Sequence, residues 1–209
     1  MTDLLVLRSS ATGAQSVSNA LIDELLTQWR AREPGLRVVD RDLDRDPLPH
    51  VTQANLAGVG RAAPENAATA ETRARADRLI EEAEAADVLV IGAPMYNVGL
   101  PSTLKSWFDH VLRAGRTFRY TAAGPEGLLR GKRAIVISVR AGLYSEGPGV
   151  ADDHQEPHLR TLLRFVGITD VEFVRAEKLA FGDQARAEAL AAARTRLPEV
   201  IGASLAVAA

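Results

Sequence analysis

Hydroxyl side chains gather in one short loop directly before a predicted helix. Ser10 and Ser16 lie between the apolar run Leu4–Leu7 and a helical pattern over residues 17–32, and Ser18 lies in the first turn of that pattern. The first turn of a helix leaves backbone N–H groups unpaired and carries a partial positive charge. Together with the hydroxyl groups, this predicts a site for a phosphate monoester held without lysine. The alternative is that Ser16 and Ser18 only cap the helix.

The same loop argues against three other kinds of phosphate chemistry. It contains neither G-x-G-x-x-G nor G-x-x-x-x-G-K-[ST], so a Rossmann-type dinucleotide site and an NTPase site are not expected. The end of the first predicted strand is Arg8-Ser9-Ser10, which offers no aspartate for a phosphorylated receiver domain.

Two further loops of unusual composition follow apolar runs. Pro94–Pro101 combines prolines, an aromatic ring, a carboxamide and a glycine, which suits backbone amides laid against the edge of a flat heteroaromatic ring. A sharp strand-to-helix turn explains the same composition without any ligand. Val139-Arg140-Ala141-Gly142 supplies small residues that allow a ligand to approach closely.

These loops must be positioned by the elements between them. Short apolar runs alternate with stretches of helical spacing, which is typical of a parallel sheet wrapped by helices. We predict an α/β three-layer sandwich: a five-stranded parallel sheet of order 2-1-3-4-5 with helices on both faces. Ligands of such sheets bind outside the carboxyl ends of the strands, where the three loops would converge. No linker divides the chain, so residues 1–209 are expected to form one domain.

The expected boundaries follow from the apolar patterns. The predicted strands are Leu4–Leu7, Arg37–Leu43, Val88–Ile91, Ala134–Ile137 and Val171–Val174. The predicted helices are 17–32, 69–86, 104–112, 159–166 and 183–197. Residues 44–70 show no clear pattern, and 116–129 is expected to be irregular.

Composition excludes several classes of protein. The 25 basic and 27 acidic residues give a net charge of −2, so nucleic acid is not an expected partner. Cysteine is absent, which removes disulfides, thiolate metal sites and thiol nucleophiles. His154 and His158 lie four apart, but Gln155 replaces the glutamate of a zinc-protease helix and Pro157 interrupts the spacing. We expect no metal site.

No segment of the sequence suggests a membrane or secretory role. No apolar run approaches the 18–20 residues, roughly, that span a bilayer. The first residues, Met1-Thr2-Asp3, carry an acid where a signal peptide has Lys or Arg. We therefore expect no membrane partner and a cytoplasmic location.

Several longer stretches resemble one family of flavoenzymes. They are Pro94-Met95-Tyr96-Asn97, Ala114–Tyr120, Gly124-Pro125-Glu126-Gly127-Leu128 and Gly167-Ile168-Thr169-Asp170. In these stretches, and over almost its whole length, the chain resembles the FMN-dependent NADH azoreductases, also called FMN-dependent NADH:quinone oxidoreductases. The resemblance implies a flavodoxin-like fold with FMN as the cofactor.

The resemblance also implies which residues hold FMN. Its phosphate would be held by Ser10 and by Ser16-Val17-Ser18. The isoalloxazine ring would lie against Met95-Tyr96-Asn97-Val98 and Val139-Arg140-Ala141-Gly142. Val98 replaces the usual Phe of the family, which removes an aromatic wall and is expected to alter substrate preference. Val139 and Ala141 replace a hydroxyl residue and a glycine, which removes one side-chain contact.

The activity that the resemblance implies is a ping-pong reaction through FMN. NADH or NADPH delivers hydride to the flavin, and a quinone is then reduced by two electrons or an azo compound is cleaved reductively. The flavin carries this chemistry, so no catalytic side chain is expected. Phe118, Tyr120 and Tyr144 are candidate substrate contacts. The family also implies a homodimer, for which residues 116–129 would provide a lid or a partner-contacting flap.

Two other functions remain open from the residues alone. A flavodoxin-like electron carrier would pass single electrons to a redox partner, but such carriers are typically strongly acidic, unlike this chain. A reductase of free FMN, dependent on NADH or NADPH, would bind flavin weakly as a substrate.

Overall fold

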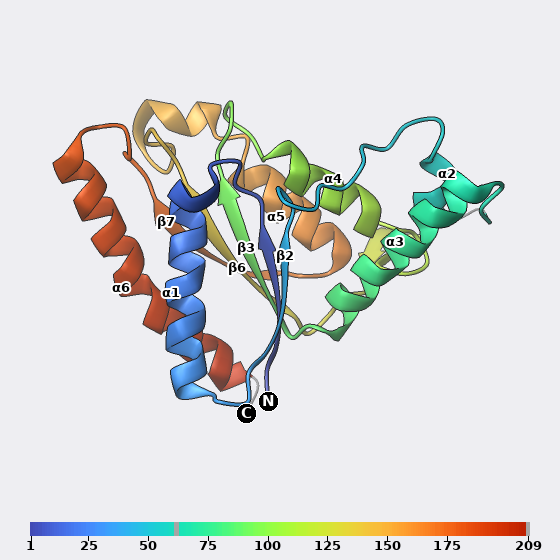
Figure 1. Ribbon diagram of the computed structural model, residues 1–209, viewed down its shortest axis with the longest axis horizontal. Coiled ribbons are helices and arrows are strands. Elements are labelled where there is room, and N and C mark those ends of the chain that lie inside the picture. The colour runs from blue at the N-terminus through green and yellow to red at the C-terminus, as the bar shows by residue number, and fades with distance from the viewer. Residues whose placement is uncertain (61–62, 208–209) are drawn as a thin grey trace.

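The computed structural model describes residues 1–60 and 63–207, and a parallel sheet forms its centre (Figure 1). Its strand order is β2-β1-β3-β6-β7, with every neighbouring pair parallel. Strands β4 and β5 belong to a separate hairpin, so β6 and β7 are the fourth and fifth strands of this sheet in chain order. The predicted order 2-1-3-4-5 is therefore confirmed. The strands are β1 (Asp3–Arg8), β2 (Arg37–Asp42), β3 (Val88–Pro94), β6 (Arg133–Val139) and β7 (Asp170–Ala176).

Helices cover both faces of the sheet, as predicted (Figure 1). The first face is covered by α1 (Val17–Arg32) and α6 (Asp183–Val207). The second face is covered by α3 (Ala67–Ala85), α4 (Ser102–Val111) and α5 (Glu156–Val166). None of the helices in the described part of the chain is long and apolar enough to cross a membrane.

The apolar runs form strands because both of their faces are buried. In β1, Leu5 and Leu7 pack into the core beneath α3, α4 and α5, whereas Leu4 and Val6 pack into the core beneath α1 and α6. Alternate side chains of a strand point to opposite faces, so a central strand without polar residues satisfies both cores. The three central strands end together at one edge of the sheet, which we call the carboxyl edge.

The main departure from the predicted elements lies in residues 116–129. These residues form a two-stranded antiparallel hairpin of β4 (Phe118–Thr121) and β5 (Gly124–Gly127) instead of an irregular loop. The strands have four residues each, too short for a period-2 pattern to emerge. Gly127 packs against Gly167 at the end of α5, where a Cβ on Gly127 would stand 2.0 Å from the Gly167 nitrogen.

Smaller differences affect loops and helix ends. A short helix, α2 (Leu56–Val59), lies in the region without a pattern, and two 3-10 turns occupy Gly13–Gln15 and Gly147–Asp152. Helix α6 continues past the predicted end at 197 and includes Pro198.

Candidate functional site

The loops that follow β1, β3 and β6 meet at the carboxyl edge of the sheet around one cavity. Its volume is about 280 Å³. Residues of all three loops line it, together with the segment that leads from β7 into α6. The lining residues are Ser10, Thr12, Gln15, Val17, Ser18, Pro94, Met95, Tyr96, Val139, Ala141, Leu179, Ala180 and Arg186.

The first turn of α1 presents hydrogen-bond donors to this cavity. Ser16 is the N-cap, and its Oγ accepts the Asn19 amide proton at 3.1 Å. Its Oγ also lies 3.2 Å from Ser18 Oγ. The amides of Val17 and Ser18 make no hydrogen bond to any described residue, as expected for the first positions of a helix. Capping therefore uses part of the donor set and leaves two amides and a serine pair for a ligand.

Tyr96 ties the first loop to the second. The Ala11 amide donates to the Tyr96 hydroxyl at 3.0 Å, and Ser10 Oγ lies 3.5 Å from the same oxygen. The Met95 amide donates to the Val139 carbonyl at 2.8 Å, which holds the second loop against the third. The hydroxyl of Tyr96 thus has a positioning task within the walls of the cavity.

Residues 96–99 form a tight turn with an unusual backbone. The Tyr96 amide donates to the Gly99 carbonyl at 3.2 Å and the Gly99 amide donates back at 3.0 Å. Asn97 and Val98, between them, have φ angles of 48° and 62°. Positive φ at both central residues is characteristic of a type I′ turn. Asn tolerates this conformation, but a β-branched residue such as Val98 is strained in it.

Arg140 does not line the cavity, although its loop does. Its side chain is fully buried and lies within 3.2 Å of carboxylate oxygens of Asp153, Glu156 and Glu177. Its Nε also donates to Gln155 Oε1 at 3.0 Å, and Gln155 in turn donates to the Ala93 carbonyl at the end of β3. This buried ionic cluster fastens the third loop to β3, α5 and the end of β7.

Glu177 connects the buried ionic cluster to the loop that contains Tyr144. The amides of Tyr144 and Ser145 both donate to Glu177 Oε1, at 2.9 and 3.1 Å. Burial alone would raise the pKa of Glu177, but hydrogen bonds from Ser145 and Tyr144 and the charge of Arg140 outweigh burial and lower the pKa. Glu177 therefore stays ionised below the usual range for glutamate.

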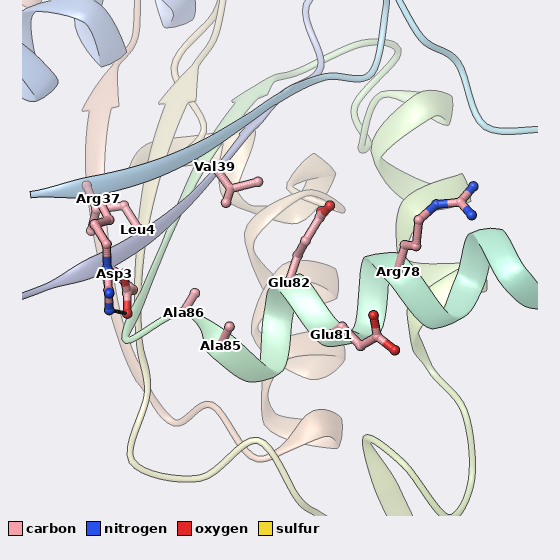
Figure 2. Close-up of a pocket in the computed structure, with 9 residues that line it drawn as sticks. All are labelled: Asp3, Leu4, Arg37, Val39, Arg78, Glu81, Glu82, Ala85 and Ala86. Atoms are coloured by element: carbon pink, nitrogen blue, oxygen red, sulfur yellow. Dashed lines mark hydrogen bonds and ion pairs between the residues drawn. The ribbon is translucent and has the colours of Figure 1, made fainter.

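A larger hollow lies at the other end of the sheet, near the first residues of β1 and β2 (Figure 2). Its volume is about 520 Å³, and its floor includes Leu4, Val39 and Ala86. Three of its charged residues are paired: Arg37 donates to Asp3, and Glu82 accepts from Arg41, which lies outside the hollow. We call this the amino-edge hollow.

Comparison with known proteins identifies the family. The family model for the flavodoxin-like fold matches residues 2–201. The chain is 54% identical over 200 residues to the FMN-dependent NADH:quinone oxidoreductase of Hyphomonas neptunium, covering 96% of both chains. It is 50% identical over 203 residues to FMN-dependent NADH:quinone oxidoreductase 3 of Pseudomonas aeruginosa, covering 96% of this chain and 93% of that protein. The chain belongs to the FMN-dependent NADH:quinone oxidoreductase family.

A solved structure supports the same assignment. The crystal structure of an azoreductase from Bacillus anthracis superposes with a TM-score of 0.87 at 28% identity, covering 96% of this chain and 99% of that chain. The flavodoxin-like fold expected from the sequence is therefore confirmed.

The structure brings together most of the residues that the family resemblance suggested. Seven of the twelve predicted cofactor residues line the carboxyl-edge cavity: Ser10, Val17, Ser18, Met95, Tyr96, Val139 and Ala141. The other five are not among its lining residues. Ser16 caps α1 beneath the cavity, Asn97 and Val98 are exposed at the turn, and Gly142 lies beneath the ring of Tyr144. Arg140 points into the buried ionic cluster.

The three aromatic residues predicted to contact substrate lie apart from the cavity. Phe118 is buried, with its ring edge-on to Tyr120 and Phe165. Tyr120 is 65% exposed on the hairpin. Tyr144 lies beside Arg140, whose guanidinium carbon is 5.9 Å from the ring centre. None of the three lines the carboxyl-edge cavity.

Sequence reasoning missed one wall of the cavity. Leu179, Ala180 and Arg186 come from the segment between β7 and α6, which follows a strand end just as the other three loops do. The rule that ligands bind at strand ends could have drawn attention to this segment. Thr12, Gln15 and Pro94 lie inside loops that were predicted but were not named as contacts.

Proposed function

We propose that this protein is an FMN-dependent oxidoreductase that uses NADH to reduce quinones by two electrons and to cleave azo compounds reductively. The observation that carries the proposal is the carboxyl-edge cavity, where the start of α1, with its unpaired amides and serine hydroxyls, and the loops after β3 and β6 line one space. Relatives at about half identity over nearly the whole chain are named FMN-dependent NADH:quinone oxidoreductases, and a solved structure at 28% identity is named an azoreductase.

The donor set of the cavity fits the phosphate of FMN. Phosphate monoesters are bound at helix N-termini by backbone N–H groups and hydroxyls. We assign this task to Ser10 and to the turn formed by Ser16, Val17 and Ser18. Ser10 is 3% exposed and Ser18 1% exposed, so bonds to these hydroxyls are shielded from water.

We assign the isoalloxazine ring to the loops after β3 and β6. Met95, Val139 and Ala141 give an apolar surface, and the exposed turn at Asn97 and Val98 leaves two amides without intramolecular partners among the described residues. The chemistry that FMN supplies when bound is two-electron transfer from NADH to the acceptor. Amides near the ring favour the negative charge that reduction brings.

The remaining residues of the site position these groups. The Tyr96 hydroxyl is engaged by the Ala11 amide, so its role is to hold two loops together. Arg140 holds its loop in place through ion pairs with buried carboxylates beneath the cavity. We assign this loop contacts to FMN through its backbone and its small side chains. No side chain is required as a nucleophile or a metal ligand in this proposal.

The proposal extends to assembly and location. We propose one domain over residues 1–209, a homodimer, and a location in the cytoplasm, where NADH is available. In this proposal the hairpin formed by β4 and β5 contacts the partner subunit. Size-exclusion chromatography with light scattering tests the dimer, and a monomer at micromolar concentration contradicts it.

Turnover tests the proposed function. Purified protein is supplemented with FMN, and NADH oxidation is followed with and without a benzoquinone. We expect fast oxidation only when protein, FMN and quinone are all present. NADPH in place of NADH then determines the preferred donor. Absence of quinone-dependent oxidation at saturating FMN contradicts the proposal.

A further inference from the structure

Among the described residues, Arg186 is the one charged side chain that lines the carboxyl-edge cavity, and it is exposed to solvent. No carboxylate lines the cavity, and the Arg186 guanidinium has no hydrogen bond or ion pair with any other residue in 1–60 or 63–207. Arg194, two turns further along the same helix, is paired in a bidentate manner with Glu24. The cation at the cavity therefore lacks the counter-charge that its neighbour on α6 has.

The position of Arg186 is fixed by the third loop of the site. The Lys178, Leu179 and Ala180 amides donate to the carbonyls of residues 142, 140 and 141, at 2.8, 3.3 and 3.0 Å. Gly182 then turns the chain with a φ of 100°, and its carbonyl accepts the Arg186 amide proton at 3.0 Å. The start of α6 is thus fastened to the loop that follows β6.

Helix register places Arg186 level with the start of α1. Both helices begin at the carboxyl edge and run in the same direction (Figure 1). The ion pair between Arg194 and Glu24, at 2.9 Å, fixes their relative height. Eight residues back from each partner lie Arg186 and Ser16, and a helix rises by the same amount per residue in both cases. The backbone of Arg186 therefore lies at the level of the N-cap serine, and Arg186 and Ser18 line the same cavity.

The electrostatics of this location favour an anion. Arg186 occupies the first turn of α6 (residue 183 onward), where the helix macrodipole disfavours a cation. The start of α1 adds a second region of positive potential on the other side of the cavity. A phosphate group between them offsets both, and a guanidinium can donate two hydrogen bonds to phosphate oxygens.

We propose that Arg186 binds the phosphate of FMN from α6, opposite the serines of α1, and so makes the site selective for FMN over riboflavin. This inference rests on the proposed function. It assigns one charged contact to a phosphate site whose other donors are uncharged.

The test compares two flavins that differ only in the phosphate. FMN and riboflavin are titrated into wild-type protein, Arg186→Gln and Arg186→Lys, and flavin fluorescence reports the dissociation constants. We expect Arg186→Gln to weaken FMN binding by about ten- to a hundredfold, the range for one hydrogen bond to a charged group. Riboflavin binding should stay within about twofold, and Arg186→Lys should recover part of the loss because a point charge remains.

Arg30→Gln is the matched control. It removes the same charge from the opposite end of α1, in the last turn of that helix, and should leave the FMN constant unchanged. Raising ionic strength should weaken FMN binding in wild type and Arg30→Gln more than in Arg186→Gln, because screening acts on the charged contact.

Three results would overturn the inference. An equal loss for FMN and riboflavin in Arg186→Gln indicates a general effect on the fold, and an unchanged FMN constant shows that Arg186 makes no contact. A raised KM for NADH with unchanged FMN affinity assigns Arg186 to the dinucleotide instead. Failure of wild-type protein to bind FMN at all contradicts the proposed function itself, which distinguishes that failure from the failure of this inference.

Discussion

The two ends of the sheet carry hollows that differ in chemistry more than in size. The amino-edge hollow is the larger, about 520 Å³ against about 280 Å³ at the carboxyl edge. At the amino edge, Asp3 and Glu82 are paired with arginines of β2, and Arg78, the cation left unpaired within residues 1–60 and 63–207, is exposed. At the carboxyl edge, the amides of Val17 and Ser18, of which Ser18 is buried, have no partner among the described residues.

This difference indicates which hollow is a binding site. An unpaired donor close to the protein interior costs free energy that a ligand can recover, whereas a paired charge has no such demand. Helix geometry strengthens the contrast, because α1 begins at the carboxyl edge and α3 ends at the amino edge. A helix start attracts anions and a helix end does not. Unsatisfied donors, and not volume, mark the site.

The largest effect is expected from the support beneath the carboxyl edge. Arg140→Ala leaves Asp153, Glu156 and Glu177 buried without their shared cation. Breaking a buried pair in this way typically costs about 3–5 kcal/mol, which denaturant unfolding monitored by circular dichroism can measure. The matched change at the amino edge, Arg37→Ala, removes an exposed ion pair and should leave stability nearly unchanged. Equal losses for the two variants would show that the ends are supported alike.

The next effect concerns the ligand itself. Replacing Ser16 and Ser18 together with Ala should weaken FMN binding by about 1–3 kcal/mol, because hydrogen bonds to a charged phosphate are lost. Fluorescence titration measures the change. Ala85→Leu, which narrows the amino-edge hollow, is the control and should leave FMN affinity as in wild type. Unchanged affinity in the serine double variant would mean that these hydroxyls only cap α1.

The next effect is the dependence of stability on acid pH, which should differ between Glu177 near the carboxyl edge and Asp3 at the amino edge. The pKa of Glu177 is lowered in the folded protein, so its stabilising contribution is present above the unfolded pKa, roughly 4.3, and is lost as pH falls through the folded value. In the Glu177→Gln variant, the free energy of unfolding should therefore fall less steeply as pH is lowered than it does in wild type. Asp3→Asn should reduce this slope less, since Asp3, whose pKa is lowered chiefly by the hydrogen bond from Arg37, belongs to a more exposed pair. The reverse order of the two slopes would contradict this.

The smallest effect is expected at the turn after β3. Val98 has a φ of 62°, which costs a β-branched residue about 1–2 kcal/mol. Val98→Asn should raise the free energy of unfolding by up to about 1 kcal/mol, because Asn adopts this conformation more easily. Thermal unfolding measures it. A less stable variant would show that contacts of the valine side chain outweigh the backbone strain.

Much of the fold could be predicted because local pattern and burial agree. The runs at Leu4–Leu7 and Val88–Ile91 are apolar because both faces of these strands are buried. The role of the serine loop at the start of a helix could also be predicted, because only a few residue types, serine among them, are favoured as N-caps. The β4–β5 hairpin could not, because its strands are short and its close approach at Gly127 depends on a distant residue, Gly167.

The limits at the site have the same physical origin. The family resemblance implied that Arg140 contacts the cofactor, and the structure shows that Glu156 of α5 and Glu177, directly after β7, hold its side chain in the interior. Arg186 was missed because its role depends on how α6 packs beside α1, as shown by the ion pair from Arg194 to Glu24. Contacts between segments far apart in the chain decide both cases, and no local pattern encodes them.

A crystal structure of the protein with FMN tests the central claim most directly. We expect the phosphate at the first turn of α1, within hydrogen-bond distance of the Val17 and Ser18 amides, and the ring against the turn at residues 96–99. Density for FMN in the amino-edge hollow beside Val39 and Ala86, or a carboxyl-edge cavity left empty at saturating FMN, would contradict the account.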